Sequence, residues 1–387
     1  MSAAHPRSGG RPGRHRRYPA ASSALPGAYL RPRAPTPATV PSSAPSAELP
    51  ELAVLQRIVQ EGGADLQQRV VGEADAAERR FPLTCVMLGN PAPGLPAVGF
   101  FGGVHGLERI GAEVVLAFLQ SLVVRLRWDT LLRRLLESLR LVFMPVVNPG
   151  GLWRGTRANP NGVDLMRNAP LDAAERVPFL VGGQRLSASL PWYRGAEGAP
   201  MQAESAALCR VVEDELLAGR PFAIAVDCHS GFGLRDRLWF PFAHSRRPIE
   251  HLPEMHALCE LFEQSHAHHP YVFEPQSRQY LAHGDLWDHL YLRACAAAAP
   301  GCGFLPLTLE MGSWLWVKKN PRQLLSRHGL FNPLIDHRQQ RVLRRHLPWF
   351  DFVARAAASH AGWMPRGAER AQRRRQALAR WYGSAPA

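Results

Sequence analysis

The chain has 387 residues, of which 46% are hydrophobic and 20% are charged. This composition is typical of globular proteins, and the length is ample for a buried core, so a wholly disordered or fibrous protein is excluded. A membrane span is also excluded, because no run of about 18 consecutive apolar residues occurs.

The formal net charge of +14 is concentrated at the two ends of the chain. Residues 1–50 carry seven Arg against Glu48, which gives +6, and residues 338–387 carry eleven Arg against Asp351 and Glu369, which gives +9. The middle is therefore close to neutral, at −1. A near-neutral centre gives no electrostatic basis for binding a phosphate backbone, so we do not expect nucleic acid as a partner.

Six cysteines occur without a CxxC pair, at Cys85, Cys209, Cys228, Cys259, Cys295 and Cys302. Their spacing favours neither a zinc knuckle nor a disulfide framework. The N-terminal segment also lacks the uninterrupted apolar stretch of a secretory signal peptide. We therefore expect reduced thiols and a cytoplasmic protein.

The predicted elements begin after a leader. Residues 1–47 are rich in Pro, Ala, Ser and Arg without an apolar period, which predicts a disordered basic segment. From residue 48, apolar residues recur at helical spacing up to Gly62 and Gly63, which predicts a helix. Five apolar runs then predict buried strands over residues 82–89, 97–104, 140–148, 222–229 and 303–312.

Between the second and third predicted strands, an amphipathic stretch from Ile110 to Leu122 predicts a long helix. Alternating strands and helices favour an α/β fold, in which ligands bind at the carboxyl ends of the strands. We assign residues 48–335 to one central domain. Residues 336–387, which are helical in pattern and rich in Arg, are expected to form a peripheral appendage.

Candidate metal ligands follow two of the strands. The sequence GGVHGLERIG places His105 and Glu108 three residues apart where a strand gives way to a helix, so both side chains can face one point. Zn²⁺ prefers such ligands, and a catalytic zinc needs three of them. His229, at the strand end in AVDCHSG, can supply the third. For the HxxE pair, the alternative is a solvated turn. For His229, the alternative is a core histidine bonded to a backbone carbonyl.

Charged residues on neighbouring segments complete the set of candidates. The third strand leads into a loop with Arg154, Arg157 and Arg167, which can bind oxyanions or, alternatively, pair with surface acids. Glu310 ends the last apolar strand as a lone carboxylate. Burial would raise its pKa, which suits a general base, whereas an ion pair with an arginine is the structural alternative.

With these segments in this order, the chain resembles the M14 family of zinc carboxypeptidases. The resemblance spans roughly residues 48–335 and rests on HxxE at 105–108, RxNxNGVDLxRN at 157–168, His229 and Glu310. It implies an α/β fold built on a mixed, twisted eight-stranded sheet flanked by helices.

The resemblance also implies roles. One Zn²⁺ per chain would be bound by His105, Glu108 and His229, Glu310 would act as general base and then acid, and Arg157 would polarise the scissile carbonyl.

Three further residues match the family's motifs. Asp164 would accept the second ring proton of the first zinc histidine, Arg167 would bind the substrate's terminal carboxylate, and Tyr280 in YLAHGDLWD would close over the substrate. For Tyr280, a packing role is the alternative.

Two positions depart from the family's pattern. Leu107 stands where many members have Arg, and Met166 stands where many have Asn beside the carboxylate-binding Arg; Met has no donor for a carboxylate. We expect a metallocarboxypeptidase that cleaves a peptide or amide bond. The alternatives are a deacylase of N-acyl amino acids, of the succinylglutamate desuccinylase and aspartoacylase type, and an inactive binding protein with basic ends. The sequence indicates neither side-chain preference nor oligomeric state.

Overall fold

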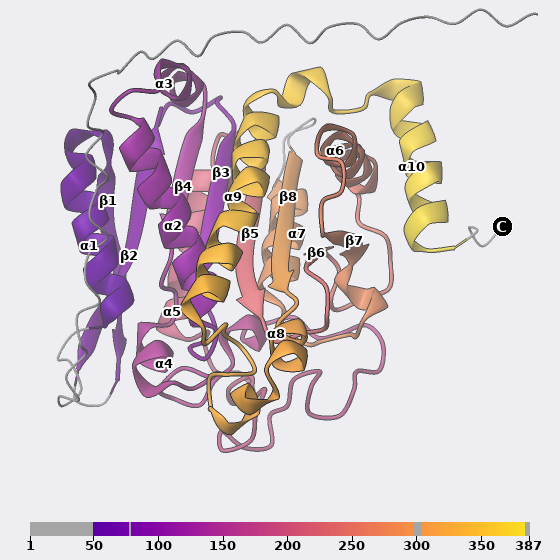
Figure 1. Cartoon of the computed structure of the whole chain (residues 1–387). Helices are drawn as coiled ribbons and strands as arrows, with labels where there is room; N and C mark the ends of the chain where they lie inside the picture. Colours follow the sequence, from indigo (N-terminus) through magenta and orange to yellow (C-terminus); the bar gives the residue numbers. More distant parts are fainter. Residues whose placement is uncertain (1–48, 77–78, 298–302, 384–387) are drawn as a thin grey trace, which may run out of the picture. The chain divides into compact units, whose positions relative to one another are not determined.

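A computed structural model describes residues 49–76, 79–297 and 303–383 (Figure 1). The predicted leader, residues 1–47, lies outside these ranges. Within them, no helix is both long enough and apolar enough to cross a membrane.

The central element is one mixed eight-stranded sheet, which confirms the predicted fold class. Its strands are β1 (Gln67–Asp75), β2 (Arg80–Gly89), β3 (Ala97–Gly102), β4 (Arg140–Met144), β5 (Phe222–Ser230), β6 (Arg237–Phe240), β7 (Val272–Pro275) and β8 (Gly303–Met311). They lie in the order β1-β2-β4-β3-β5-β8-β6-β7. The central strands β4, β3, β5 and β8 are parallel, whereas β2 is antiparallel to β4 and β6 is antiparallel to β8.

The five predicted strands correspond to β2, β3, β4, β5 and β8, while β1, β6 and β7 were missed. β1 is an edge strand whose side chains are mostly exposed, and β6 and β7 have only four residues each. β1 carries no long apolar run because its side chains are mostly exposed, whereas β6 and β7 are mostly buried but too short to form such a run.

Helices cover both faces of the sheet. They are α1 (Pro50–Gly62), α2 (Arg109–Arg125), α3 (Thr130–Glu137), α4 (Pro149–Arg154), α5 (Ala203–Val211), α6 (Leu252–Ser265), α7 (Leu286–Ala297), α8 (Trp314–Lys319), α9 (Asp336–Ala358) and α10 (Gly367–Trp381). Figure 1 shows α2 and α9 in front of the sheet and α7 behind it. The predicted helices α1 and α2 are thus observed, and α2 buries its apolar stripe against the sheet.

The prediction that residues 336–387 form a peripheral appendage is wrong for α9. Trp349 and Phe350 are fully buried in the main core, and the ring centroid of Phe350 lies 4.9 Å from that of Phe100 on β3 and 5.3 Å from that of Phe118 on α2. The many arginines of this stretch hide an apolar face at helical spacing, which completes one side of the sheet.

The last helix, α10, packs on α6 with charges as well as apolar groups. Arg370, Arg373 and Arg380 pair with glutamates of α6, and the indole of Trp381 is buried and donates to the Phe273 carbonyl at 2.8 Å. Much of the basic charge of this end is therefore neutralised within the chain.

Candidate active site

The site lies where β3, β5 and β8 end. His105 and Glu108 occupy the turn between β3 and α2, His229 is near the end of β5, and Glu310 is near the end of β8. Because these strands are parallel neighbours, their carboxyl ends meet at one edge of the sheet. The turn passes so close to α4 that a Cβ on Gly106 would lie 2.0 Å from the Gly151 carbonyl carbon, so this position requires glycine.

The structure brings together the three residues predicted as metal ligands. His105 Nδ1 lies 2.9 Å from a Glu108 carboxylate oxygen, and His229 Nδ1 lies 3.2 Å from the other oxygen and 3.2 Å from His105 Nδ1. The three side chains are buried, and their ligand atoms lie within 4.8 Å of one another. Neither alternative, a solvated turn or a histidine on a backbone carbonyl, describes this geometry.

Both imidazoles are oriented by a carboxylate behind them. His105 Nε2 lies 3.0 Å from Asp164 Oδ1, and His229 Nε2 lies 2.7 Å from Asp227 Oδ2, which also accepts the Trp287 indole N–H at 2.9 Å. With Nε2 fixed in this way, each ring presents Nδ1 to the centre.

Asp227 was missed in the sequence. A signal was present, since Asp227 and His229 are two residues apart on a strand and therefore point to the same face.

The buried ionisable groups of the cluster shift one another's pKa values. Burial alone would raise the pKa of Glu108, but His105 and His229 hold it well below its usual range. Burial likewise opposes ionisation of Asp164, yet Arg157, His105 and Arg167 lower its pKa well below normal. Against burial, Asp227 and Glu108 raise the pKa of His229 well above normal. The two carboxylates thus remain charged in a buried site, because the neighbouring imidazoles and guanidinium groups stabilise their negative charge.

Glu310 faces the same point from the neighbouring strand. It is the register partner of His229 across β5 and β8, and one of its carboxylate oxygens accepts the Phe232 N–H at 3.0 Å. Burial, reinforced by Glu108, raises the pKa of Glu310 to about 8, although His229 and Arg157 oppose the shift. The alternative of an ion pair is not observed, since no arginine lies within ion-pair distance of Glu310 among the residues that the structure describes.

Two of the three loop arginines pair with acids of the site rather than with surface acids. Arg157 donates to Asp164 at 2.9 Å and to Glu108 at 3.1 Å. Arg167 donates to Asp164 at 3.3 Å and to the Val181 carbonyl at 2.9 Å. Arg154 instead donates to a backbone carbonyl in its own loop. Arg157 and Arg167 thus converge on the carboxylate that orients His105.

A small pocket joins these groups. His105, His229, Arg167 and Glu310 line it, together with Met166, Trp239, Gln276, Ala282, Asp285 and Thr308. The Tyr280 ring lies close by, with its centroid 6.0 Å from the Arg167 guanidinium carbon, and it packs against Phe232 and Trp239. Burial raises the pKa of the Tyr280 hydroxyl, which keeps it a hydrogen-bond donor.

Asp285 and Asn332 support the site but were not predicted. Asp285 Oδ1 accepts the N–H groups of Trp287 and Asp288 at the start of α7, and burial raises its pKa to about 8. Asn332 accepts the Ile110 N–H at 3.0 Å and donates to the Leu107 carbonyl at 2.7 Å, which fixes the turn that carries His105 and Glu108. Since Asn332 is more than 220 residues away in sequence, no local pattern points to it.

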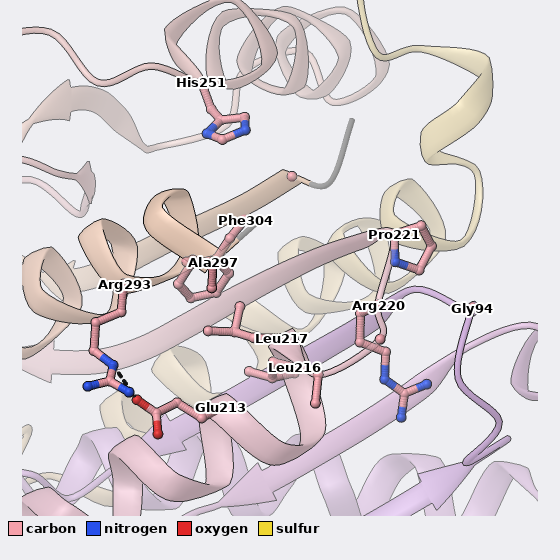
Figure 2. A pocket seen from close by; sticks show the side chains of 14 residues that line it. Gly94, Glu213, Leu216, Leu217, Arg220, Pro221, His251, Arg293, Ala297 and Phe304 are labelled. Carbon is pink, nitrogen blue, oxygen red and sulfur yellow. Dashed lines mark ion pairs between the residues drawn. The ribbon is translucent and has the colours of Figure 1, made fainter. Parts of the chain in front are cut away.

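A second pocket, of about 680 Å³, lies at the amino ends of β5 and β8, opposite the strand ends that carry the histidines (Figure 2). Leu216, Leu217 and Phe304 give it apolar walls, and Glu213 and Arg293 pair at 2.6 Å on its lining. None of the predicted site residues lines it.

A sequence profile described as zinc carboxypeptidase matches residues 77–297, which is more than half of the 387 residues. The chain belongs to the zinc carboxypeptidase family. The resemblance inferred from the motifs is thereby confirmed.

Individual relatives match a shorter part of the chain than the family profile does. Carboxypeptidase SOL1 of Arabidopsis thaliana is 36% identical over 75 residues, covering 19% of this chain and 15% of the relative. Carboxypeptidase M of Mus musculus is 34% identical over 91 residues, covering 21% of this chain and 20% of the relative. The chain thus matches a fifth or less of the length of these relatives.

Solved structures share the fold over most of the chain. Thrombin-activatable fibrinolysis inhibitor superposes with a TM-score of 0.59 at 18% identity, covering 79% of this chain and 72% of that one. Carboxypeptidase A from Helicoverpa armigera superposes with a TM-score of 0.57 at 17% identity, covering 80% of this chain and 72% of that one.

Proposed function

We propose that this protein is a zinc-dependent metallocarboxypeptidase that hydrolyses the last peptide bond of its substrate. The observation that carries the proposal is the convergence of His105, Glu108 and His229, with Glu310 beside them as the register partner of His229. Membership of the zinc carboxypeptidase family supports the same activity.

The residues present fit one Zn²⁺ per chain. Two imidazole nitrogens and one carboxylate are the ligand set of many catalytic zinc sites, which leave a fourth position open. Both rings already present Nδ1 to the centre, because Asp164 and Asp227 hold their Nε2 atoms. When bound, Zn²⁺ supplies a Lewis acid that lowers the pKa of water to ~7.

Glu310 moves the proton. It removes a proton from the attacking water as the water adds to the scissile carbonyl, and it then delivers this proton to the departing amine. A carboxyl group whose pKa is raised towards neutrality suits both steps. Arg157, which Asp164 and Glu108 hold in place, stabilises the negative charge that develops on the carbonyl oxygen.

Arg167 and Tyr280 bind the substrate's terminal carboxylate. Asp164 and the Val181 carbonyl fix the Arg167 guanidinium, and the Tyr280 ring packs beside it. Met166 lines the same pocket without offering a donor. Arg167 therefore carries more of the carboxylate recognition here than it would beside an asparagine.

Metal analysis of the purified chain tests the centre. We expect about one zinc per chain, consistent with a three-ligand site, and its loss in His105→Ala. The matched control His337→Ala changes an exposed histidine of α9 and should retain the metal. A protein that binds no zinc would contradict the proposal.

A substrate panel tests the reaction. Peptides with a free terminal carboxylate should be cleaved, the same peptides ending in an amide should be poor substrates, and Arg167→Ala should remove most of this difference. Hydrolysis of N-acyl amino acids in place of peptides would establish the deacylase alternative instead.

A further inference from the structure

The segment that follows Glu310 carries positive charge without any acid. Residues 311–335 contain Lys318, Lys319, Arg322 and Arg327 and neither Asp nor Glu. The two lysines are the only ones among the 46 Lys and Arg residues of the chain. Among the described residues, none of these four cations lies within ion-pair distance of a carboxylate. The arginines of α10, in contrast, mostly pair with α6.

Two leucines project from the same segment. Leu325 is 90% exposed and Leu324 is 62% exposed, which makes Leu325 the most exposed large apolar side chain that the structure describes. The adjacent Gln323 is buried and donates to the carbonyls of Gly329 and Asn332 at 2.8 and 3.2 Å. The backbone is thus anchored while the two leucines point outward. We call Lys318, Lys319, Arg322, Leu324, Leu325 and Arg327 the 318–327 patch.

The segment that leads into the patch starts beside the active site. Trp314, which opens α8, donates its indole N–H to the Gly231 carbonyl at 2.8 Å, and its ring lies 5.6 Å from that of Phe232. The Phe232 N–H in turn contacts Glu310. The start of α8 is therefore anchored close to the strand end that carries Glu310.

We propose that the 318–327 patch is a docking surface for an anionic lipid bilayer. Cations attract the phosphate and carboxylate groups of anionic lipids, and exposed leucines between them enter the boundary of the acyl chains. Nucleic acid would be bound by cations and by aromatic stacking, and it offers nothing to cover two leucines. In this arrangement the patch lies on the membrane surface, and none of the helices that the structure describes crosses the bilayer. The proposal does not rest on the peptidase activity.

Vesicle sedimentation of the full chain tests the surface. We expect binding to vesicles of phosphatidylcholine containing about one third phosphatidylserine at about 0.1 M salt, and binding at least roughly tenfold weaker to phosphatidylcholine alone. Lys318→Glu/Lys319→Glu and Leu324→Ser/Leu325→Ser should each weaken binding roughly tenfold. Both variants should keep the far-UV circular dichroism spectrum and the thermal unfolding midpoint of wild type, which shows that they are folded.

Matched variants control for charge and apolarity. Arg374→Glu/Arg375→Glu makes the same charge change on exposed residues of α10, and Leu131→Ser/Leu186→Ser removes two leucines that are 68% and 70% exposed. Both should bind vesicles within about twofold of wild type, since they lie outside the patch. The proposal is overturned if the wild-type chain does not bind anionic vesicles, or if the patch variants bind them as wild type does. It is equally overturned if the patch variants lose binding to duplex DNA or polyglutamate while vesicles are not bound.

Discussion

Charged side chains gather in two regions of the molecule, and their surroundings differ. At the ends of β3, β5 and β8, carboxylates, imidazoles and guanidinium groups are buried and bond to one another around a shared point. On α9 and α10 the charges lie mainly at the surface, while the apolar faces of these helices are buried. Charge is expected to determine chemistry in the first region, whereas apolar contacts determine stability in the second.

The largest expected effect belongs to the first region. Glu310→Gln keeps the shape of the side chain but removes its ability to accept a proton. Turnover should fall by about 10²–10⁴-fold with zinc still bound. Steady-state kinetics with zinc analysis measures both, and Glu197→Gln, at an exposed position, serves as the control. Undiminished turnover would remove Glu310 from its proposed role.

Phe350→Ala tests whether apolar burial dominates on α9. The ring is fully buried against Phe100 and Phe118, so truncation should lower the free energy of unfolding by about 3–5 kcal/mol. Urea denaturation measures the change, and Phe179→Ala, at a side chain that is 80% exposed, should change it little. Equal effects of the two substitutions would mean that α9 is not part of the core.

His346 is a buried titratable group of α9, and its effect depends on pH. Burial lowers its pKa to about 4, and its Nδ1 lies 2.9 Å from the Tyr271 hydroxyl. The unfolded chain binds this proton near pH ~6.5, so stability should fall as pH decreases from there towards 4. Across this interval His346→Gln should lose less stability than wild type, by on the order of 2–3 kcal/mol. Parallel pH profiles for wild type and variant would contradict the assignment, and His337→Gln, at an exposed histidine, should follow the wild type.

Asp227→Asn tests the orientation of His229. The amide keeps the shape but loses the charge that holds the Nε2–H, so zinc affinity should fall about 10–100-fold. Competition with a chromogenic chelator reports affinity without using activity. Asp214→Asn, at an exposed position, should leave affinity unchanged. An unchanged affinity in Asp227→Asn would show that the charge of Asp227 is not needed to orient the ring.

The smallest effect is expected at the surface of α10. Two hydrogen bonds, of 2.6 and 3.0 Å, join the Arg380 guanidinium to the Glu263 carboxylate, but both side chains are about one third exposed. Arg380→Ala should therefore cost only about 0.2–1 kcal/mol of unfolding free energy, and less in high salt. A loss comparable to that of Phe350→Ala would overturn the contrast between the two regions.

The parts predicted from sequence are those in which local patterns carry the information. Apolar runs predicted the central strands, and the motifs around His105, Arg157, His229 and Glu310 predicted the residues that meet at their ends. The short strands β6 and β7 carry too few residues for a pattern. Asn332 supports the turn that carries His105 and Glu108 through contacts that span more than 220 residues, and only the fold creates them. The core role of α9 was missed because its arginines outweighed an apolar stripe that was visible at helical spacing.

The pairing of His229 with Glu310 ties the chemistry to the alignment of two strands. Side chains alternate between the faces of a sheet, so inserting a single residue into β8 ahead of Glu310 would turn its carboxylate to the opposite layer. Such a chain could keep its hydrogen-bonded ladder and the three candidate ligands while losing the carboxylate proposed to carry the proton. The number of residues within β8 ahead of Glu310 is therefore constrained by the site as well as by the sheet.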